Sequence, residues 1–315
     1  MSRVITVGAA QLGPIARHET RREVVTRLLA LLRRAHEARC DLVVFPELAL
    51  TTFFPRWVFD DEAELDAFYE REMPNEATLP LFEEASRLGI GFHLGYAELV
   101  VEEGRKRHFN TSVLVERDGR IVGKYRKIHL PGTAEPVPGA PGHHLEKRYF
   151  DVGDLGFPVF RAFGGVVGMC ICNDRRWPET YRVMGLQGVE LIMLGYNSPV
   201  GLGESFDMAA LEPFHNHLVM QSGAYQNATW VIGVAKCGRE EGYNMIGESA
   251  IIAPSGEIVA MAHTLEDELV VARCDLDFGR RYSEGIFDFA RHRRPEHYRL
   301  IVERTGAEPP PEGEV

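Results

Sequence analysis

The chain has 315 residues, a length that allows one large domain or two ordinary ones. Hydrophobic residues make up 45% of it and charged residues 26%, which is typical of a globular protein. The formal net charge of −11 argues against a broad nucleic-acid or anionic-membrane footprint, because phosphate groups are bound by clustered Lys and Arg.

The N-terminus and the cysteines indicate a compartment. The first residues, MSRVITVGAAQLG, run directly into a strand pattern without the apolar core of a signal peptide. No apolar run approaches membrane-spanning length. The cysteines are scattered and odd in number, which fits reduced thiols better than disulfides: Cys40, Cys170, Cys172, Cys237 and Cys274. We therefore expect a cytoplasmic protein.

Strand and helix patterns alternate along the first half of the chain. Val4–Leu12 alternates as a strand, and Thr20–Arg39 carries apolar residues at helical spacing. An Asp118-Gly119 turn predicts a hairpin between two later strands. The other expected strands are 42–45, 90–101, 111–116 and 120–125, and the other helices are 62–72 and 77–88.

The second half begins with a Pro- and Gly-rich loop, His129–His144, which is too long for a simple connector and is predicted to be functional. Helices are expected from Pro178 to about Gln187 and over about Met208–Gln226. Strands are expected at 159–163, 166–172, 191–196, 230–236, 249–253, 257–262 and 269–275.

The order of these elements predicts the fold class. Strands and helices interleave, several hairpins occur, and neither a repeat nor a linker is visible, so an α/β sandwich with mixed sheets fits best. We expect a single domain over residues 1–305. Residues 306–315, rich in Pro and Glu, are predicted to be a disordered tail.

Three predicted strands end at a polar or reactive side chain: VVFPE at Glu47, GKYRK at Lys127 and GMCIC at Cys172. Such strand ends commonly carry the reactive groups of α/β proteins. Cys172 is a candidate nucleophile, with Glu47 as its base and Lys127 as the cation that binds an oxyanion. All three residue types are also common in structural roles, and spacing alone does not bring them together.

Cys170 lies two residues before Cys172, on the same face of the predicted strand. Their Cα atoms would be ~6.6 Å apart with parallel side chains, which is near the limit for a disulfide. No second Cys-x-Cys or His-x-x-His group completes a zinc site. We interpret Cys170 as packing, with a redox or metal site built on the pair as an alternative.

Arg175 and Arg176 follow the same strand end. A guanidinium group grips a carboxylate through two parallel hydrogen bonds, so this pair predicts a substrate that carries a carboxylate. A solvated pair of charges is the alternative. Three histidines flank the expected pocket, although a lone histidine is more often structural: His129, His144 and His215.

Four segments in one register resemble the nitrilase superfamily and, more narrowly, the N-carbamoyl-D-amino-acid amidohydrolases: FPELALTTFFPRW, KYRKIHLPG, HLEKRYF and CNDRRWPE. The resemblance covers about residues 3–304. It implies a four-layer α-β-β-α sandwich that assembles into a homo-oligomer, usually a tetramer, with a dimer as the alternative.

The resemblance also assigns roles. The family's catalytic triad matches Glu47, Lys127 and Cys172, and a supporting glutamate matches Glu146. No metal or cofactor is implied. Ser198 stands where Thr is expected, and the segments Gly132–His143 and Val200–Leu211 match poorly, so side-chain preference is the least determined feature. The family's substrate contacts match His144, Asn173, Arg175, Arg176 and Asn197, and histidines linked to activity match His129 and His215. We expect Ser198, which keeps the hydroxyl of the family's Thr, to contact the substrate as well.

The implied reaction is hydrolysis of N-carbamoyl-D-amino acids to D-amino acid, carbon dioxide and ammonia through a covalent cysteine intermediate. The D preference follows from the resemblance alone, because chirality is read by pocket shape. The expected partner is this small molecule, with neither nucleic acid nor membrane. The alternatives are a β-ureidopropionase-like enzyme, an aliphatic amidase, or a non-catalytic binding protein of the superfamily.

Overall fold

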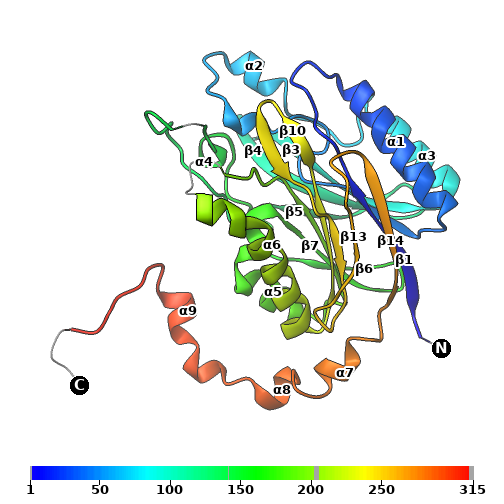
Figure 1. Cartoon of the computed structure of the whole chain (residues 1–315), viewed down its shortest axis with the longest axis vertical. Coiled ribbons are helices and arrows are strands. Elements are labelled where there is room, and N and C mark those ends of the chain that lie inside the picture. Colours follow the sequence, from blue (N-terminus) through cyan, green and yellow to red (C-terminus); the bar gives the residue numbers. More distant parts are fainter. Residues whose placement is uncertain (1, 141, 202–205, 312–315) are drawn as a thin grey trace.

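Two six-stranded sheets pack face to face in the computed structural model, within residues 2–140, 142–201 and 206–311, the part of the chain that it describes. Helices α1 and α3 cover one sheet, and α5 and α6 cover the other (Figure 1). The four layers confirm the predicted α-β-β-α sandwich.

The strands of each sheet are mixed in direction, with parallel strands at the centre. The first sheet has the order β14-β1-β2-β3-β4-β5 and the second β13-β12-β9-β8-β7-β6. The bounds are β1 Val4–Gln11, β2 Leu42–Val44, β3 Gly91–Glu102, β4 Arg105–Val115, β5 Ile121–Arg126, β6 Val159–Ala162, β7 Gly165–Ile171, β8 Leu191–Tyr196, β9 Trp230–Ala235, β12 Ala250–Ile252, β13 Ile258–Met261 and β14 Glu268–Asp275, and a separate hairpin pairs β10 Cys237–Glu240 with β11 Tyr243–Ile246.

The helices cover the outer faces of the sheets. Helix α1 begins after a capping box in which Thr20 and Glu23 each bond the other's backbone, and it buries its Val24–Ala35 stripe on the first sheet. The largest core includes residues between the two sheets and residues of α5 and α6 that pack on the second sheet. The helix bounds are α1 Arg21–Glu37, α2 Glu62–Asp66, α3 Leu79–Leu88, α4 Glu146–Tyr149, α5 Pro178–Gly185, α6 Phe206–Asn227, α7 Arg280–Ser283, α8 Phe289–His292 and α9 Arg299–Glu303, with short 3₁₀ turns η1 Phe54–Arg56, η2 Cys172–Arg176 and η3 Pro295–His297.

Most predicted elements are confirmed, and β8 coincides with the predicted strand 191–196. The helix predicted over 62–72 is wrong in its second half, because the chain turns after α2 and Glu70 instead pairs with the backbone at Ala97 and Leu99 of β3. Strand β4 begins at Arg105, six residues earlier than predicted, since its charged start pairs with the exposed end of β3. The β10–β11 hairpin was not predicted.

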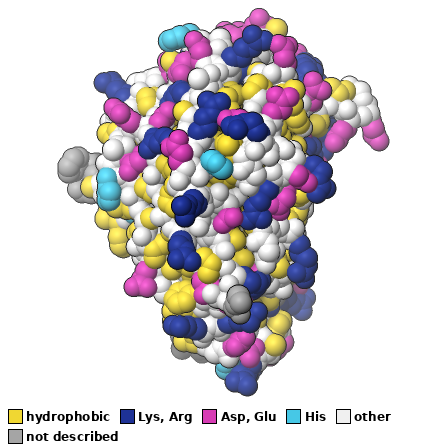
Figure 2. All heavy atoms as spheres, turned by 90° about the vertical axis from the view of Figure 1, so that its right-hand side faces the viewer, with side chains coloured by type: hydrophobic (Ala, Val, Ile, Leu, Met, Phe, Trp, Pro, Cys, Tyr) yellow, Lys and Arg dark blue, Asp and Glu magenta, His cyan; other side chains and the backbone are white. Residues whose placement is uncertain are grey.

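The surface and the poorly matching segments complete the picture. On the face in Figure 2, acidic and basic side chains are intermixed. Within the described ranges, no helix combines the length and the apolar character needed to cross a membrane. Of the segment Val200–Leu211, residues 202–205 lie outside the described part of the chain. Residues 306–311 of the predicted tail are exposed, and 312–315 also lie outside it.

Candidate active site

The predicted catalytic residues meet where four strands end. Glu47 follows β2, Lys127 follows β5, Cys172 follows β7 and Asn197 follows β8. Each of these side chains is at most 1% exposed. Lys127 Nζ donates to Glu47 Oε1 at 2.7 Å and to Glu146 Oε2 at 2.6 Å. The topology therefore brings together residues up to 150 positions apart, from Glu47 to Asn197.

Two glycines allow the segment that carries Glu47 to lie between the sheets. A Cβ atom on Gly195 of β8 would lie 2.4 Å from the backbone nitrogen of Glu47. One on Gly95 of β3 would lie 2.6 Å from the carbonyl oxygen of Pro46. Any larger residue at either position would collide with backbone, so glycine here sets the depth of Glu47.

Hydrogen bonds fix the carboxylate of Glu47. Besides Lys127, Asn110 Nδ2 donates to Oε1 at 2.7 Å and the backbone N–H of Asn197 donates to Oε2 at 2.8 Å. The Asn197 side chain also donates to the carbonyl of Glu47 at 2.9 Å. We did not predict Asn110, although an asparagine inside an apolar strand is unusual enough to have indicated it.

Cys172 lies at a strained position directly after β7. Its φ is +48°, in the left-handed region that side-chain-bearing residues rarely adopt. The turn removes Sγ from the strand and places it 3.6 Å from the carbonyl of Asn197 and 3.7 Å from Arg175 Nη1. Burial, followed by the charge of Glu47, raises the pKa of the thiol against the opposing charges of Lys127 and Arg175. A base is therefore needed to produce the thiolate.

Lys127 and Glu146 stabilise each other's charged forms. Burial by itself lowers the pKa of Lys127, but the negative charges of the Cys172 thiolate, Glu146 and Glu47 outweigh it and the pKa is raised. Burial raises the pKa of Glu146, yet Lys127 and a 2.9 Å contact from His144 Nε2 reverse this and the pKa is lowered. The site thus keeps Lys127 and Glu146 charged out of contact with water.

Arg175, which we expected to contact a substrate carboxylate together with Arg176, is buried. The 3₁₀ turn η2 points it inward, and it is 1% exposed. Its guanidinium donates to Asn216 Oδ1 at 3.0 Å, to the carbonyl of Cys172 at 2.7 Å and to Ser198 Oγ at 2.9 Å. Because most of its donors are used internally, Arg175 holds the nucleophile turn in shape, and Asn216 is a second contributor that we did not predict.

Arg176 is exposed next to Arg175, and its Nη1 lies 3.4 Å from Oδ1 of Asn173. Asn173 is half-buried and donates to the carbonyl of His129 at 3.1 Å. His129 Nδ1 lies 2.8 Å from Asp174 Oδ1, and its ring stacks on Trp177. Hydrogen bonds and ring stacking therefore link these residues to one another beside Cys172.

The other two predicted histidines, His144 and His215, differ in their burial and in their contacts with the site. His144 is half-buried between Glu146 and the ring of Phe53, at a centroid distance of 5.0 Å. His215 is exposed on α6 beside Phe214, and no hydrogen bond among the described residues joins it to the site. The helix turns His215 outward because its neighbour Asn216 faces inward to Arg175.

The predicted alternative of a redox or metal site finds no geometric match. All five cysteines lie within the described ranges, and each is buried and free. Cys170 packs in the core on the face of β7 that is covered by α5 and α6, in agreement with its interpretation as packing. Within the described ranges, no group of three or more His, Cys, Asp or Glu side chains is arranged to hold a metal ion.

Known proteins resemble this chain over most of its length. The carbon-nitrogen hydrolase family matches residues 6–284. An N-carbamoylputrescine amidase of Arabidopsis thaliana is 32% identical over 289 residues, which cover 88% of this chain and 89% of that protein. A nitrilase of Pyrococcus abyssi is 30% identical over 269 residues, which cover 85% and 90%.

Solved structures share the fold. A carbon-nitrogen hydrolase of Helicobacter pylori has a TM-score of 0.82 at 24% identity, covering 96% of this chain and 99% of that one. A Nesterenkonia amidase, with an acetamide moiety added covalently at its active-site cysteine, has a TM-score of 0.72 at 19% identity, covering 96% and 97%. The family match and the relatives together show that this chain belongs to the carbon-nitrogen hydrolase family of the nitrilase superfamily, whose members hydrolyse C–N bonds.

Proposed function

We propose that the protein hydrolyses N-carbamoyl-D-amino acids to the D-amino acid, carbon dioxide and ammonia. The contact between Lys127, Glu47 and Glu146 beside the thiol of Cys172 carries the proposal for the chemistry. The exposed Arg176 supports an anionic substrate, and the family membership supports C–N hydrolysis.

The first half-reaction forms a carbamoyl thioester. Glu47 takes the proton of Cys172, and the sulfur attacks the ureido carbon. Lys127 uses two of its three N–H donors on the carboxylates among the described residues, which leaves the third for the oxyanion. The protonated Glu47 then gives its proton to the leaving nitrogen, and the amino acid departs. A single oxyanion donor contributes ~10²–10³ in rate, which matters for a resonance-stabilised urea.

The second half-reaction regenerates the thiol. Glu47 takes a proton from a water molecule, and the hydroxyl adds to the thioester carbon. The carbon–sulfur bond breaks, and the thiolate takes back the proton from Glu47. The released carbamate decomposes to carbon dioxide and ammonia. Glu146 bonds Lys127 throughout and so holds the ammonium beside both transition states.

Arg176 is the residue that we assign to the substrate carboxylate. It is exposed beside the site, whereas Arg175 is 1% exposed. A carboxylate held by Arg176 would place the ureido carbon a few ångströms from the guanidinium, towards Sγ. We assign the ureido group to Asn197 and Asn173, which flank the nucleophile.

A second candidate is hydrolysis of an N-carbamoyl amine that lacks the carboxylate. The relatives that are named N-carbamoylputrescine amidases, at 30–32% identity, favour it. The two candidates share every catalytic step and differ only in the charge of the substrate's far end. Arg176 would repel an ammonium group, which is why the carboxylate is the first choice.

The deciding experiment measures ammonia release from paired D- and L-N-carbamoyl amino acids, N-carbamoylputrescine, N-carbamoyl-β-alanine and simple amides. We expect the D-carbamoyl amino acids to have the highest kcat/KM. Arg176→Ala should lower kcat/KM for carboxylate substrates by ~10-fold or more while leaving neutral amides within ~2-fold. Preference for N-carbamoylputrescine, or equal losses on both classes, would refute the assignment.

We also propose that the protein is a homo-oligomer, a tetramer or a dimer. A groove of about 990 Å³ runs between α5, α6 and the C-terminal segment that carries α8 and α9. Exposed apolar side chains line it, among them Val183, Leu186, Leu218 and Ile301. Patches of this kind are unusual on monomers. Light scattering should give a multiple of 35.4 kDa, and Leu218→Asp should lower it.

A cytoplasmic location is part of the same proposal. The five cysteines are free and buried, and disulfides are rare in reducing compartments. Cell fractionation with an antibody to the protein tests the location directly. Enrichment in a membrane or secreted fraction would contradict it.

A further inference from the structure

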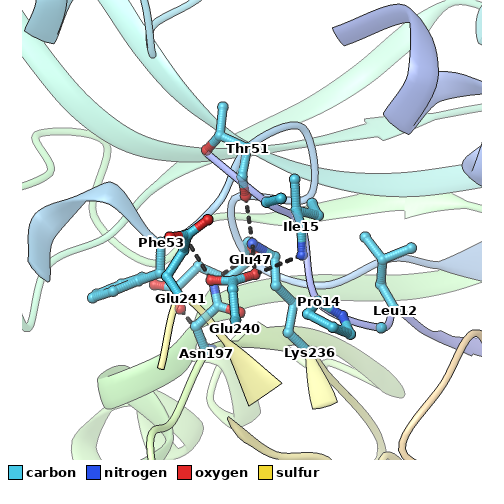
Figure 3. Close-up of polar contacts among 12 residues, drawn as sticks. Leu12, Pro14, Ile15, Glu47, Thr51, Phe53, Asn197, Lys236, Glu240 and Glu241 are labelled. Atoms are coloured by element: carbon cyan, nitrogen blue, oxygen red, sulfur yellow. Dashed lines mark hydrogen bonds and ion pairs between the residues drawn. The ribbon is translucent and has the colours of Figure 1, made fainter. Parts of the chain in front are cut away.

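A second group of buried charges lies close to Glu47, and Figure 3 labels two of its members, Lys236 and Glu240. It consists of Arg56, Lys236 and Glu240, here called the support cluster, and these residues are 4%, 0% and 0% exposed. Arg56 belongs to η1, Lys236 lies between β9 and β10, and Glu240 ends β10. The catalytic steps above use none of the three.

Glu240 is the centre of this cluster. Its Oε1 accepts from the backbone N–H of Phe53 at 2.8 Å and from Arg56 Nη2 at 2.7 Å. Its Oε2 accepts from the backbone N–H of Ile15 at 3.0 Å and from Lys236 Nζ at 3.2 Å. One buried carboxylate therefore joins three separate chain segments, and these donors occupy both of its oxygens.

Lys236 connects the cluster to the backbone that holds Glu47. Its Nζ donates to the carbonyl of Thr51, which closes the turn that begins at Leu48 directly after Glu47. Its backbone N–H donates to the carbonyl of Tyr196 at 3.2 Å, one residue before the Asn197 that binds Glu47. Figure 3 shows Glu47 and Asn197 lying next to Lys236 and Glu240. Moving Lys236 would thus shift both supports of Glu47.

Phe53 connects the same cluster to Glu146. Its N–H is held by Glu240, and its ring packs edge-on against His144, which contacts Glu146 at 2.9 Å. Two residues on, the carbonyl of Pro55 accepts from the N–H of Leu145 at 2.8 Å. The segment between residues 51 and 57 therefore joins the support cluster to the second glutamate of the site.

The charges of the two groups are complementary. The support cluster contains two cations and one anion, whereas Glu47, Lys127 and Glu146 contain one cation and two anions. Buried charges interact strongly at short range because little water screens them. The excess positive charge close to Glu47 therefore opposes the repulsion between the two catalytic carboxylates.

We propose that Arg56, Lys236 and Glu240 are positioning residues that hold Glu47 and Glu146 in line with Cys172, with Glu240 fixing the other two. This inference rests on the proposed cysteine mechanism. It assigns the cluster no contact with substrate. It predicts that damage to the cluster slows the chemical step in a protein that remains folded.

The main test compares Glu240→Gln with the wild-type enzyme well below the melting temperature. The amide keeps the volume but cannot accept from all four donors, and it leaves Lys236 and Arg56 without a counter-ion. We expect kcat to fall by ~10- to 100-fold with KM within ~3-fold, as for a small misplacement of reacting groups. Lys236→Met, which keeps the length of the side chain, should likewise lower kcat and leave KM nearly unchanged. It takes the place of Glu240→Gln in this test if that variant does not fold.

Glu190→Gln is the matched control. Glu190 directly precedes β8, at the opposite end of that strand from Tyr196. Its side chain pairs with Arg3 and accepts from the backbone N–H of Val166 in β7. It should lower the melting temperature while leaving kcat within ~2-fold. If Glu240→Gln and Lys236→Met also lose only stability, the cluster is structural and the inference is wrong.

Alkylation of Cys172 by iodoacetamide, followed by mass spectrometry of its peptide, separates this inference from the proposed function. The rate needs no substrate, and Cys172→Ala provides the blank. We expect Glu240→Gln to slow alkylation by ~10-fold at neutral pH, because Glu47 is the base that ionises the thiol. A wild-type enzyme inactive on every carbamoyl substrate would refute the proposed function. An unchanged alkylation rate in Glu240→Gln and Lys236→Met would refute the positioning role.

Discussion

Lys127 and Lys236 are both buried without exposure to solvent, and burial alone lowers the pKa of each. Their neighbours make the outcomes opposite. Lys127 faces two carboxylates and the sulfur of Cys172, and its pKa is raised. Lys236 faces the carboxylate of Glu240 and a carbonyl, with Arg56 opposing, and its pKa is lowered. Depth of burial therefore says little about what a buried lysine does.

The difference extends to the carboxylates. Glu47 lies beside the thiol whose proton it is proposed to take. The two carboxylate oxygens of Glu240 accept from four donors, two of them backbone N–H groups, and its pKa is lowered despite burial. The first arrangement suits proton transfer, whereas the second suits fixed geometry. The following predictions test this comparison.

Cys172→Ala should have the largest effect. Removal of the nucleophile should lower kcat by at least ~10³-fold, since no neighbouring thiol can replace it. The denaturant midpoint should stay close to that of the wild-type protein, because the change removes one atom and a strained turn is retained. Substantial residual turnover would contradict the covalent mechanism.

The two lysines provide the next test. Lys127→Met should lower kcat by ~10²–10³-fold through loss of the oxyanion donor, whereas Lys236→Met should lower it by only ~10-fold. Each change removes the lysine partner of a buried carboxylate and should lower the free energy of unfolding by about 3–5 kcal/mol. Steady-state kinetics and urea unfolding measure the two quantities. Equal losses of kcat would remove the distinction between the clusters.

Asn110→Leu should weaken the positioning of Glu47 without touching either lysine. It removes one neutral donor at 2.7 Å from Oε1, and such a bond contributes ~1 kcal/mol. We expect kcat to fall by ~5- to 10-fold with KM unchanged. An effect as large as that of Lys127→Met would mean that the asparagine contacts the reacting atoms.

Alkaline stability should show the opposite pKa shifts. A lysine with a raised folded pKa contributes stability below its unfolded pKa, near ~10.4, and loses it as pH rises through the folded value. A lysine with a lowered folded pKa contributes more as pH rises towards the unfolded value. The difference in unfolding free energy between wild type and Lys127→Met should therefore shrink above pH ~10. The corresponding difference for Lys236→Met should grow between neutral pH and pH ~10. Urea unfolding across this range provides the measurement.

Cys170→Ala should have the smallest effect. Its side chain packs on the face of β7 that α5 and α6 cover, and burial raises its pKa well above the ordinary value, so the thiol stays protonated. Loss of one buried atom should cost about 1 kcal/mol of stability and leave kcat within ~2-fold. A folded but inactive variant would show that the cysteine pair acts together.

The sequence alone determined the architecture and the identity of the candidate triad. Apolar runs such as Leu191–Tyr196 are buried on both faces, and this composition permits little except a central strand. Glu47, Lys127 and Cys172 were visible because each interrupts an apolar run. Their roles stay proposals, and their spacing did not bring them together, but the structure shows Lys127 bonded to Glu47.

Only the tertiary structure decided which polar residues face inward. Arg175 and Arg176 are adjacent and chemically identical, yet the η2 turn buries one and exposes the other. Glu240 lies on a hairpin whose short strands have no distinctive pattern, and its four donors come from segments up to 225 residues away. Local sequence sets the period and the strand ends, but the partners of a buried charge are set by packing between distant segments.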